Sequence, residues 1–294
     1  MNVSQQHAQA GRRLRLVVLG FGGRPDVLRE AERLRPVIER YADIVAADFS
    51  GSDDLSDTMA DAAVVIGGDG SILRAAGQMS RNQLPVIAVN LGRLGFLADI
   101  LSDELPNVLG QLAPGNIPAI EHLMLECRVY REDRCLAERL GLNEVAIQAG
   151  PPFTLLNVDL YVDAEWATSY SCDGLIVSTA IGSTGHSLSA GGPILRKDLD
   201  AFVICPISPH TLTNRPVVDS ADRVYELVVA QPRAGTSVVL DGRVLHTLEM
   251  GDRVRVQRAE PRFKLVVAPG HSYYRTLREK LGWSGRLSLH KGPS

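Results

Sequence analysis

The chain has 294 residues, of which 45% are hydrophobic and 22% are charged, and its formal net charge is −3. This composition predicts a globular protein with a large core, long enough for one big domain or two ordinary ones. The mild negative charge, without clustered Lys and Arg or a long apolar run, argues against nucleic acid and membrane partners.

The first 118 residues alternate between strand and helix patterns. A helix is predicted from Asp26, because apolar residues then recur every three and four positions, and a second helix follows Ser71. The strands between them are continuous β-branched runs, which are typical of a parallel sheet covered on both faces. These strands are predicted at residues 14–20, 43–48, 62–68 and 85–90. We therefore expect a doubly wound, Rossmann-like α/β domain over residues 1–118.

Residues 119–268 lose the helical period, and short apolar runs follow one another with turn signals between them. This pattern predicts an antiparallel β-sandwich, interrupted by one helix that starts near Ser183. Its strands are expected at residues 125–131, 142–148, 155–163, 174–178, 201–207, 224–230, 237–242, 252–258 and 263–269. Helical spacing returns at residues 273–283, and residues 269–294 are predicted to pack back on the first domain.

Cysteine usage indicates a reducing compartment. The four cysteines show neither Cys-x-x-Cys spacing nor a metal-binding pattern with His, which favours buried, reduced thiols over a zinc site or a disulfide framework. They are Cys127, Cys135, Cys172 and Cys205. The first residues, MNVSQQHAQAGRR, are polar where a secretory signal would be apolar. We therefore expect a cytoplasmic protein.

The stretch GGDGS, residues 67–71, lies between an apolar strand and a helix. Gly68 and Gly70 would let a ligand approach the backbone, and the helix N-terminus favours phosphate. The carboxylate of Asp69 would repel that phosphate. An acidic residue at this position is explained if it takes a proton from a hydroxyl nucleophile or works beside a divalent metal. The alternative is a helix N-cap in an ordinary turn. Arg74, one helical turn later, is either a phosphate ligand or a solvated surface residue.

Two further polar segments lie in the second half. Asn143 and Glu144 open a strand, where such a pair is either an exposed strand end or a binder of sugar hydroxyls. The segment 173–192 is rich in Ser and Gly and predicts a strand, a turn and a helix. It either admits a flat ligand close to the backbone or packs tightly across a sheet. Asp173 at its start is a turn residue or a ligand acceptor.

In this order the segments resemble the NAD kinase family, whose members phosphorylate NAD with ATP or polyphosphate to make NADP. The Gly-Gly-Asp-Gly turn alone is shared with lipid kinases and phosphofructokinases, whereas the Asn-Glu pair followed by the long block is specific. The matching segments are GGDGS at 67–71, NE at 143–144, DGLIVSTAIGSTGHSLSAGGPIL at 173–195, PHTLTNRPVV at 209–218 and VVLDG at 238–242. The resemblance runs from Leu16 to Leu281.

The resemblance implies a Rossmann-like domain joined to a β-sandwich, in a homodimer or homotetramer whose site can include a neighbouring subunit. It implies that Asp69 is the general base for the 2'-hydroxyl of the adenosine ribose of NAD, and that Asn143 and Glu144 hold this ribose. Mg²⁺ or another divalent cation would neutralise ATP, and no protein side chain is assigned to the metal. Further contacts with the substrates are expected from Gly68, Gly70, Arg74, Asp173, Ser183, Thr184, Gly185, His186, Ser187, Leu188, Ser189 and Asp241.

The sequence departs from the family pattern at several of these positions. The usual STPTGSTAY reads STAIGSTGH here, and two other positions lack the usual Arg and Gln. The residues concerned are Ala180, Ile181, Gly185 and His186, with Ser171 in place of the Arg and Arg243 in place of the Gln. Two other functions compete with NAD kinase: a non-catalytic NAD(H)-binding regulator on the same fold, and a lipid or sugar kinase that shares the glycine turn.

Overall fold

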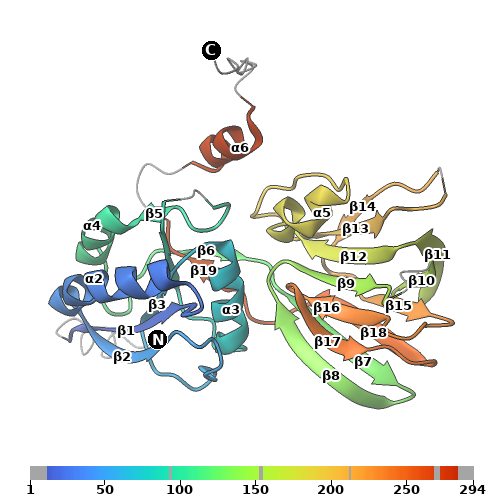
Figure 1. Cartoon of the computed structure of the whole chain (residues 1–294), viewed down its shortest axis with the longest axis horizontal. Coiled ribbons are helices and arrows are strands. Elements are labelled where there is room, and N and C mark those ends of the chain that lie inside the picture. The colour runs from blue at the N-terminus through green and yellow to red at the C-terminus, as the bar shows by residue number, and fades with distance from the viewer. Residues whose placement is uncertain (1–11, 93–94, 152–154, 212, 268–271, 284–294) are drawn as a thin grey trace.

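The computed structural model describes residues 12–92, 95–151, 155–211, 213–267 and 272–283. They form two lobes side by side, an α/β domain and an all-β domain, with the last helix above the junction (Figure 1). Within these ranges, no helix combines the length and the apolar character that crossing a bilayer requires.

The α/β domain is built on a seven-stranded sheet of order β2-β1-β3-β4-β19-β6, with β5 beside β4. All neighbours are parallel except β19 and β6. The four strands predicted for this domain are confirmed, with small differences at their ends. The strands are β1 (Leu14–Gly20), β2 (Ala42–Asp48), β3 (Ala62–Ile66), β4 (Val86–Asn90), β5 (Ile100–Leu101), β6 (Ile120–His122) and β19 (Phe263–Leu265).

Both faces of this sheet are covered, as the apolar runs predicted. Alternate residues of a strand point to opposite faces. Leu16 and Val18 of β1 pack with α2 (Pro25–Tyr41) and α4 (Leu105–Gly110), whereas Val17 and Leu19 pack with α3 (Asp69–Met79). The α3 side also holds buried residues of the second domain. These residues are Met124, Leu140, Leu142, Ile181 and Ala259. The second domain therefore packs on the face of the sheet that carries α3.

The second domain is a sandwich of two six-stranded antiparallel sheets around one core. Within that core the rings of Phe202 and Tyr225 meet edge to face, with centroids 5.7 Å apart. One sheet has the order β11-β10-β15-β18-β7-β8, built from β7 (Leu125–Arg131), β8 (Arg134–Gly141), β10 (Leu156–Val162), β11 (Glu165–Cys172), β15 (Tyr225–Val229) and β18 (Asp252–Arg258). The other has the order β14-β13-β12-β9-β16-β17, built from β9 (Glu144–Gln148), β12 (Gly174–Thr179), β13 (Ala201–Ile207), β14 (Val217–Ser220), β16 (Ser237–Leu240) and β17 (Arg243–Thr247).

Two details of these elements differ from the sequence predictions. Strands β6 and β19 lie within residues 119–268, but they pair in the sheet of the α/β domain. The strand expected at residues 263–269 is therefore not part of the sandwich. Residues 268–269 of that expected strand lie outside the described ranges. The helix expected from Ser183 is a 3₁₀ turn (Gly182–Thr184) followed by one short α-turn, α5 (His186–Ser189). Gly185 between them has φ −97° and ψ −128°, which interrupts the helical backbone.

The C-terminal helix α6 (Tyr273–Leu281) contacts both domains. Lys280 lies over the ring of Phe96 in the first domain, with Nζ 5.6 Å from the ring centroid. The hydroxyl of Tyr273 donates a hydrogen bond of 2.8 Å to the carbonyl of Leu195 in the second domain. The helix therefore returns to the first domain, as predicted, and also bridges to the second. Residues 269–271 and 284–294 of that prediction lie outside the described ranges.

All four cysteines are free, and three of them are buried. Cys135, on the edge strand β8, is exposed, so the prediction of buried thiols is wrong at this position.

Candidate active site

The turn between β3 and α3 requires a glycine at position 67. Gly67 has a φ of +145°, and a Cβ there would lie 2.2 Å from the hydroxyl oxygen of Ser71. Gly68 is the N-cap of α3, and its side-chain position faces open space, as does that of Gly70. Because the N-cap is Gly68, the interpretation of Asp69 as a helix cap is wrong.

The carboxylate of Asp69 is held by a loop of the first domain. It accepts hydrogen bonds from the backbone N–H groups of Phe96 (2.8 Å), Leu97 (3.0 Å) and Ala98 (3.1 Å). The loop approaches closely because Gly95 has no side chain: a Cβ there would lie 2.2 Å from Asp69 Oδ1. Three donors fix the orientation of the carboxylate, as a proton acceptor in catalysis requires.

Lys197 reaches the same loop from the second domain, and the sequence analysis missed it. Its ammonium donates to the carbonyl oxygen of Phe96 and lies 5.5 Å from the ring centroid of Tyr273. Burial lowers the pKa of Lys197, while the negative charges of Asp99 and Asp69 act in the opposite direction. Lys197 therefore ties the second domain and α6 to the loop that orients Asp69.

We expect Lys197→Met to lower kcat by about tenfold, since the loop that orients Asp69 loses its cross-domain anchor. Replacing a half-buried ammonium by an apolar side chain of similar length should leave the melting temperature unchanged or raise it. Steady-state kinetics and thermal melts of the same preparation check both effects. A variant with unchanged kcat would show that the contact does not serve catalysis.

Asn143 and Glu144 stand at the start of β9 and are fixed from behind by Asp241. The Asp241 carboxylate accepts hydrogen bonds from the N–H groups of Leu142 (2.7 Å), Asn143 (2.8 Å) and Glu144 (3.0 Å). Burial raises the pKa of Asp241, and the three donors counteract that rise. Asp241 was predicted to contact the substrates, and its observed contacts are with the backbone that presents Asn143 and Glu144.

The side chains of Asn143 and Glu144 keep acceptor atoms free. Asn143 Oδ1 and Glu144 Oε2 are buried and have no hydrogen-bond partner among the residues that the structure describes. A Cβ at Gly185 would lie 3.2 Å from Asn143 Nδ2 and 3.3 Å from Glu144 Oε2, and the N–H of His186 hydrogen bonds to Glu144. Since buried polar groups normally have partners, these two atoms suit the hydroxyl donors of a sugar. The structure thus brings Asn143, Glu144, Gly185 and His186 together.

Burial, with the nearby charge of Asp241, raises the pKa of Glu144 to about 8. In the folded protein the carboxyl group of Glu144 therefore stays protonated up to about pH 8. In the unfolded chain, where its pKa is 4.5, the same group loses its proton at a lower pH. The stability that this proton contributes is complete below pH 4.5 and is lost as the pH rises toward 8.

Glu144→Gln should therefore raise the melting temperature more at pH 8 than at pH 4.5, the two ends of this window. The same substitution should weaken NAD binding by about threefold to tenfold, the scale of one neutral hydrogen bond, because Glu144 is protonated at neutral pH. Thermal melts across this range and an NAD titration check the two effects. An identical pH dependence in both proteins would show that Glu144 ionises normally.

The remaining residues of the 183–189 segment have mixed environments. Ser183 is fully buried and its hydroxyl bonds within the protein, donating to the Ala180 carbonyl and accepting from the N–H of Leu195. Thr184 donates to the carbonyl of Ile181. Ser187 is buried, whereas Leu188 is half-buried and Ser189 is exposed. Contacts of these residues with NAD stay predictions.

The four unusual residues of this segment divide into two pairs. Ala180 and Ile181 are buried in apolar clusters, and Ile181 belongs to the one that joins the two domains. Gly185 and His186 lie beside Asn143 and Glu144. Ala180 and Ile181 thus change packing, whereas Gly185 and His186 change the surroundings of the candidate ligand.

Asp173 lies apart from these residues. At one end of the β9–β12 pair Gly174 faces Gln148, and at the other end Ser178 faces Glu144. Asp173 is therefore separated from Glu144 by most of a strand, roughly 15 Å at about 3.3 Å per residue. It is exposed, and its carboxylate lies 4.0 Å from His210 Nε2.

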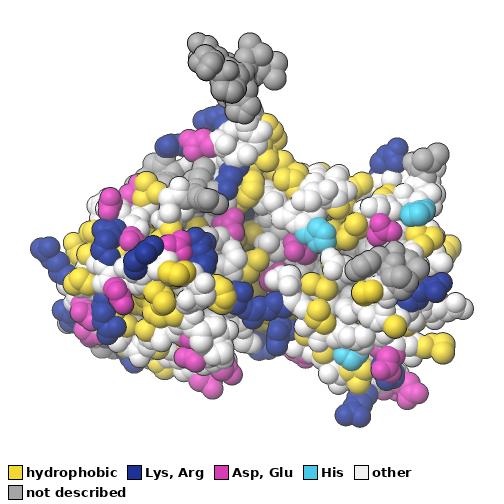
Figure 2. Space-filling view, in the orientation of Figure 1, with side chains coloured by type: hydrophobic (Ala, Val, Ile, Leu, Met, Phe, Trp, Pro, Cys, Tyr) yellow, Lys and Arg dark blue, Asp and Glu magenta, His cyan; other side chains and the backbone are white. Residues whose placement is uncertain are grey.

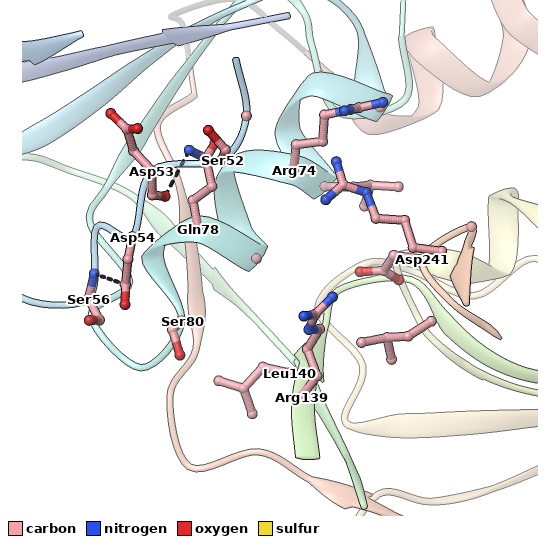
Figure 3. Close-up of a pocket in the computed structure, with 17 residues that line it drawn as sticks. Ser52, Asp53, Asp54, Ser56, Arg74, Gln78, Ser80, Arg139, Leu140 and Asp241 are labelled. Atoms are coloured by element: carbon pink, nitrogen blue, oxygen red, sulfur yellow. Dashed lines mark hydrogen bonds between the residues drawn. The ribbon is translucent and has the colours of Figure 1, made fainter. Parts of the chain in front are cut away.

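A cavity of about 600 Å³ lies between the domains, next to the residues that flank the two halves of the site. It is lined by Gly70 and Arg74 of α3 and by Asp241 from the second domain. Figure 2 shows Lys and Arg side chains gathered where the two lobes meet. In Figure 3, Arg74 and Arg139 extend from α3 and β8 toward the space between the domains, with Asp241 close by. Arg139, like Lys197, carries no sequence signal that predicted it.

An α/β domain joined to a β-sandwich, with an anchored carboxylate after a glycine turn, defines a nucleotide-dependent phosphotransferase. Family models match most of the chain: the ATP-NAD kinase N-terminal domain over residues 37–117 and the ATP-NAD kinase C-terminal domain over residues 142–268. The chain belongs to the NAD kinase family, as its motifs predicted.

Curated relatives cover nearly the whole chain. An NAD kinase of Rhodopirellula baltica is 54% identical over 281 residues, which are 96% of this chain and 90% of that protein. An NAD kinase of Geobacter metallireducens is 37% identical and covers 91% of this chain and 94% of its own length. The function is that of an NAD kinase, a kinase with an alcohol group as acceptor, and the prediction of that function is confirmed.

Solved structures confirm the fold. The crystal structure of an NAD kinase from Archaeoglobus fulgidus in complex with ATP superposes with a TM-score of 0.74 at 26% identity and covers 92% of this chain and 99% of its own. Yeast NADH kinase complexed with NADH gives a TM-score of 0.83 at 21% identity and covers 96% of this chain and 91% of its own. The predicted pairing of a Rossmann-like domain with a β-sandwich is thus correct.

Proposed function

We propose that the chain transfers the terminal phosphoryl group of ATP to the 2'-hydroxyl of the adenosine ribose of NAD, with Asp69 as the general base. The observation that carries this proposal is the fixed Asp69 carboxylate, held by three N–H groups beside an open glycine turn at the domain junction. A secondary hydroxyl is a poor nucleophile at neutral pH, so a carboxylate within hydrogen-bond reach can accept its proton as the new P–O bond forms.

Asn143 and Glu144 orient the ribose in this proposal. Their buried acceptor atoms lack partners within the described ranges and would take hydrogen bonds from ribose hydroxyls. Asp241 keeps both residues in place through the backbone. Phosphoryl transfer depends mainly on such positioning and on charge neutralisation, because the protein forms no covalent bond to the phosphoryl group.

A divalent cation is expected at the phosphates of the donor. Among the described residues, no group of three or more His, Cys, Asp or Glu side chains is placed to hold a metal ion. Mg²⁺ commonly keeps its waters and binds through substrate phosphates, where it neutralises the charge of the donor. The residues of this chain then have to bind and orient the donor, and Arg74 lines the cavity beside Gly70.

The position of Asp173 favours a homo-oligomer. Asp173 is exposed and stands at the far end of β12 from the Asn143–Glu144 pair, so it is free to contact NAD held mainly by a neighbouring copy. We propose a homodimer or homotetramer because the family resemblance assigns Asp173 to NAD, while Asp173 lies most of a strand away from Glu144. The cytoplasmic location stays a prediction from cysteine usage.

Incubation of the purified protein with Mg²⁺, ATP and NAD, NADH or a lipid tests the proposal against its alternatives. We expect NADP(H) formation from the dinucleotides and none from the lipid. A protein that binds NAD but forms no NADP(H) above the level of Asp69→Asn would be a regulator on this fold, and phosphorylated lipid would indicate a lipid kinase.

A further inference from the structure

A histidine of the first sheet contacts the backbone of Lys197. His122 is the last residue of β6, which lies beside β19 where the two lobes meet (Figure 1). Its side chain is buried, and its ring atom Nδ1 lies 3.0 Å from the carbonyl oxygen of Lys197. A carbonyl oxygen can only accept a hydrogen bond, so Nδ1 carries the hydrogen and donates it. His122 belongs to none of the motifs on which the family resemblance depends.

The surroundings of His122 favour a neutral ring. Burial lowers its pKa, whereas the hydrogen bond to Lys197 acts in the opposite direction. The charges of Lys197 and Arg262 lower this pKa further, and the charge of Asp198 raises it. A neutral imidazole with its hydrogen on Nδ1 keeps the bond and adds no second positive charge beside the lysine. The donor is therefore in place at neutral pH.

The segment 190–200 is held by side chains from other parts of the fold. The structure describes all of it, and it forms neither helix nor strand. Ser183 Oγ accepts a hydrogen bond of 3.0 Å from the N–H of Leu195, and the hydroxyl of Tyr273 in α6 donates one of 2.8 Å to the Leu195 carbonyl. His122 adds a third contact two residues further along, at the lysine itself. It therefore holds the residue whose ammonium reaches the first domain.

Three contacts in series connect His122 with the proposed general base. His122 holds the carbonyl of Lys197, and the ammonium of that lysine donates to the carbonyl of Phe96. The N–H of Phe96 in turn donates to the carboxylate of Asp69 at 2.8 Å. Misplacing a catalytic group by about 1 Å can lower a rate by about 10²-fold, so even a small displacement along this series would reduce kcat.

We propose that His122 is a positioning residue for phosphoryl transfer, which acts through Lys197 to hold the Asp69 carboxylate in its catalytic orientation. The inference rests on the role of general base proposed above for Asp69. The alternative is a histidine that only satisfies a loop carbonyl and so contributes to stability alone. The two interpretations differ in what happens to kcat, in a folded protein, when the donor at Nδ1 is removed.

His122→Leu and His122→Asn separate the hydrogen bond from the bulk of the side chain. Leucine has no donor, whereas the amide nitrogen of asparagine takes the place of Nδ1 and can still donate to the Lys197 carbonyl. We expect kcat to fall about fivefold in His122→Leu and to stay within about twofold of wild type in His122→Asn. The KM values for NAD and ATP should stay within about twofold in both. Steady-state kinetics measures these values, and thermal melts show that the variants are folded.

A double-mutant cycle with Lys197→Met tests the route to Asp69. If His122 acts through Lys197, His122→Leu should lower kcat by no more than about twofold when it is added to Lys197→Met. Losses that multiply would overturn the proposed route, and wild-type kcat in folded His122→Leu would overturn the proposal itself. If His122→Leu does not fold, His122→Gln, whose amide takes the place of Nε2, replaces it in every comparison.

His246→Leu is the matched control. His246 is a half-buried histidine of β17, and its Nε2 lies 3.3 Å from the Asp252 carboxylate. This substitution should change the melting temperature and leave kcat at the wild-type value. A low kcat in Asp69→Asn together with wild-type kcat in His122→Leu would overturn the role of His122 alone. Near-normal kcat in Asp69→Asn would instead overturn both this role and the proposed general base.

Discussion

Asp69→Asn should lower kcat by about 10³-fold while the protein stays folded, because the amide cannot accept the proton of the 2'-hydroxyl. The amide oxygen can still accept hydrogen bonds from Leu97 and Ala98, which now bond to Asp69 Oδ1, so only the Phe96 contact is lost. The expected cost is about 1 kcal/mol of stability, or a few degrees in melting temperature. Steady-state NADP formation and thermal melts measure the two effects.

Asp103→Asn serves as the control for this substitution. The Asp103 side chain is 91% exposed and its ion pair with Arg33 is on the surface, so wild-type turnover is expected. Near-normal kcat in Asp69→Asn would remove Asp69 from the role of general base.

Asp241→Ala should be the most destabilising of the substitutions considered. It leaves the N–H groups of Leu142, Asn143 and Glu144 without their acceptor, and Asp241 has a φ of +46°, which disfavours alanine. We expect the free energy of unfolding to fall by about 3–5 kcal/mol. NAD binding should fall as well, because the Asn143–Glu144 pair loses its support. Urea denaturation and an NAD titration provide the measurements.

Asp241→Asn is the conservative comparison for Asp241→Ala. Asparagine keeps one acceptor oxygen and tolerates positive φ, so it should lose clearly less stability than Asp241→Ala. Equal unfolding midpoints for wild type and Asp241→Ala would contradict the structural role assigned to this carboxylate.

The sequence predicted the central strands of both domains and missed the edges of the sandwich. Strands β8, β11, β14 and β17 were not predicted, and each of them is the outermost strand of its sheet. Their residues are largely exposed, as the burial of β8 and β17 shows. Edge strands carry charged and polar residues, so the apolar signal that marks a buried strand is weak in them.

The sequence predicted those residues of the site that belong to short local motifs. The Gly-Gly-Asp-Gly turn and the Asn-Glu pair were found because their chemistry and spacing are local. Their supports come from distant segments: the 96–98 loop and Lys197 for Asp69, and Asp241 for the Asn143–Glu144 pair. Only the folded chain brings these segments together, so no local pattern predicted what they contact.

The role of the departures from the family motif also needed the structure. The sequence could not show that Ile181 belongs to the apolar cluster between the domains, whereas Gly185 lies against Asn143 and Glu144. Arg243 was noted as a departure, but its place in the cavity with Arg74 and Arg139 depends on how the two domains meet.

Single-turnover formation of NADP tests the central claim, that Asp69 accepts the proton of the 2'-hydroxyl. Wild type and Asp69→Asn are mixed with saturating Mg-ATP and NAD, and the phosphorylated position is identified by phosphorus NMR. The account predicts a 2'-phosphate on the adenosine ribose, and a transfer rate about 10³-fold lower in Asp69→Asn with NAD and ATP binding within about twofold of wild type. Transfer by Asp69→Asn within about tenfold of wild type, or phosphate at another position, would contradict it.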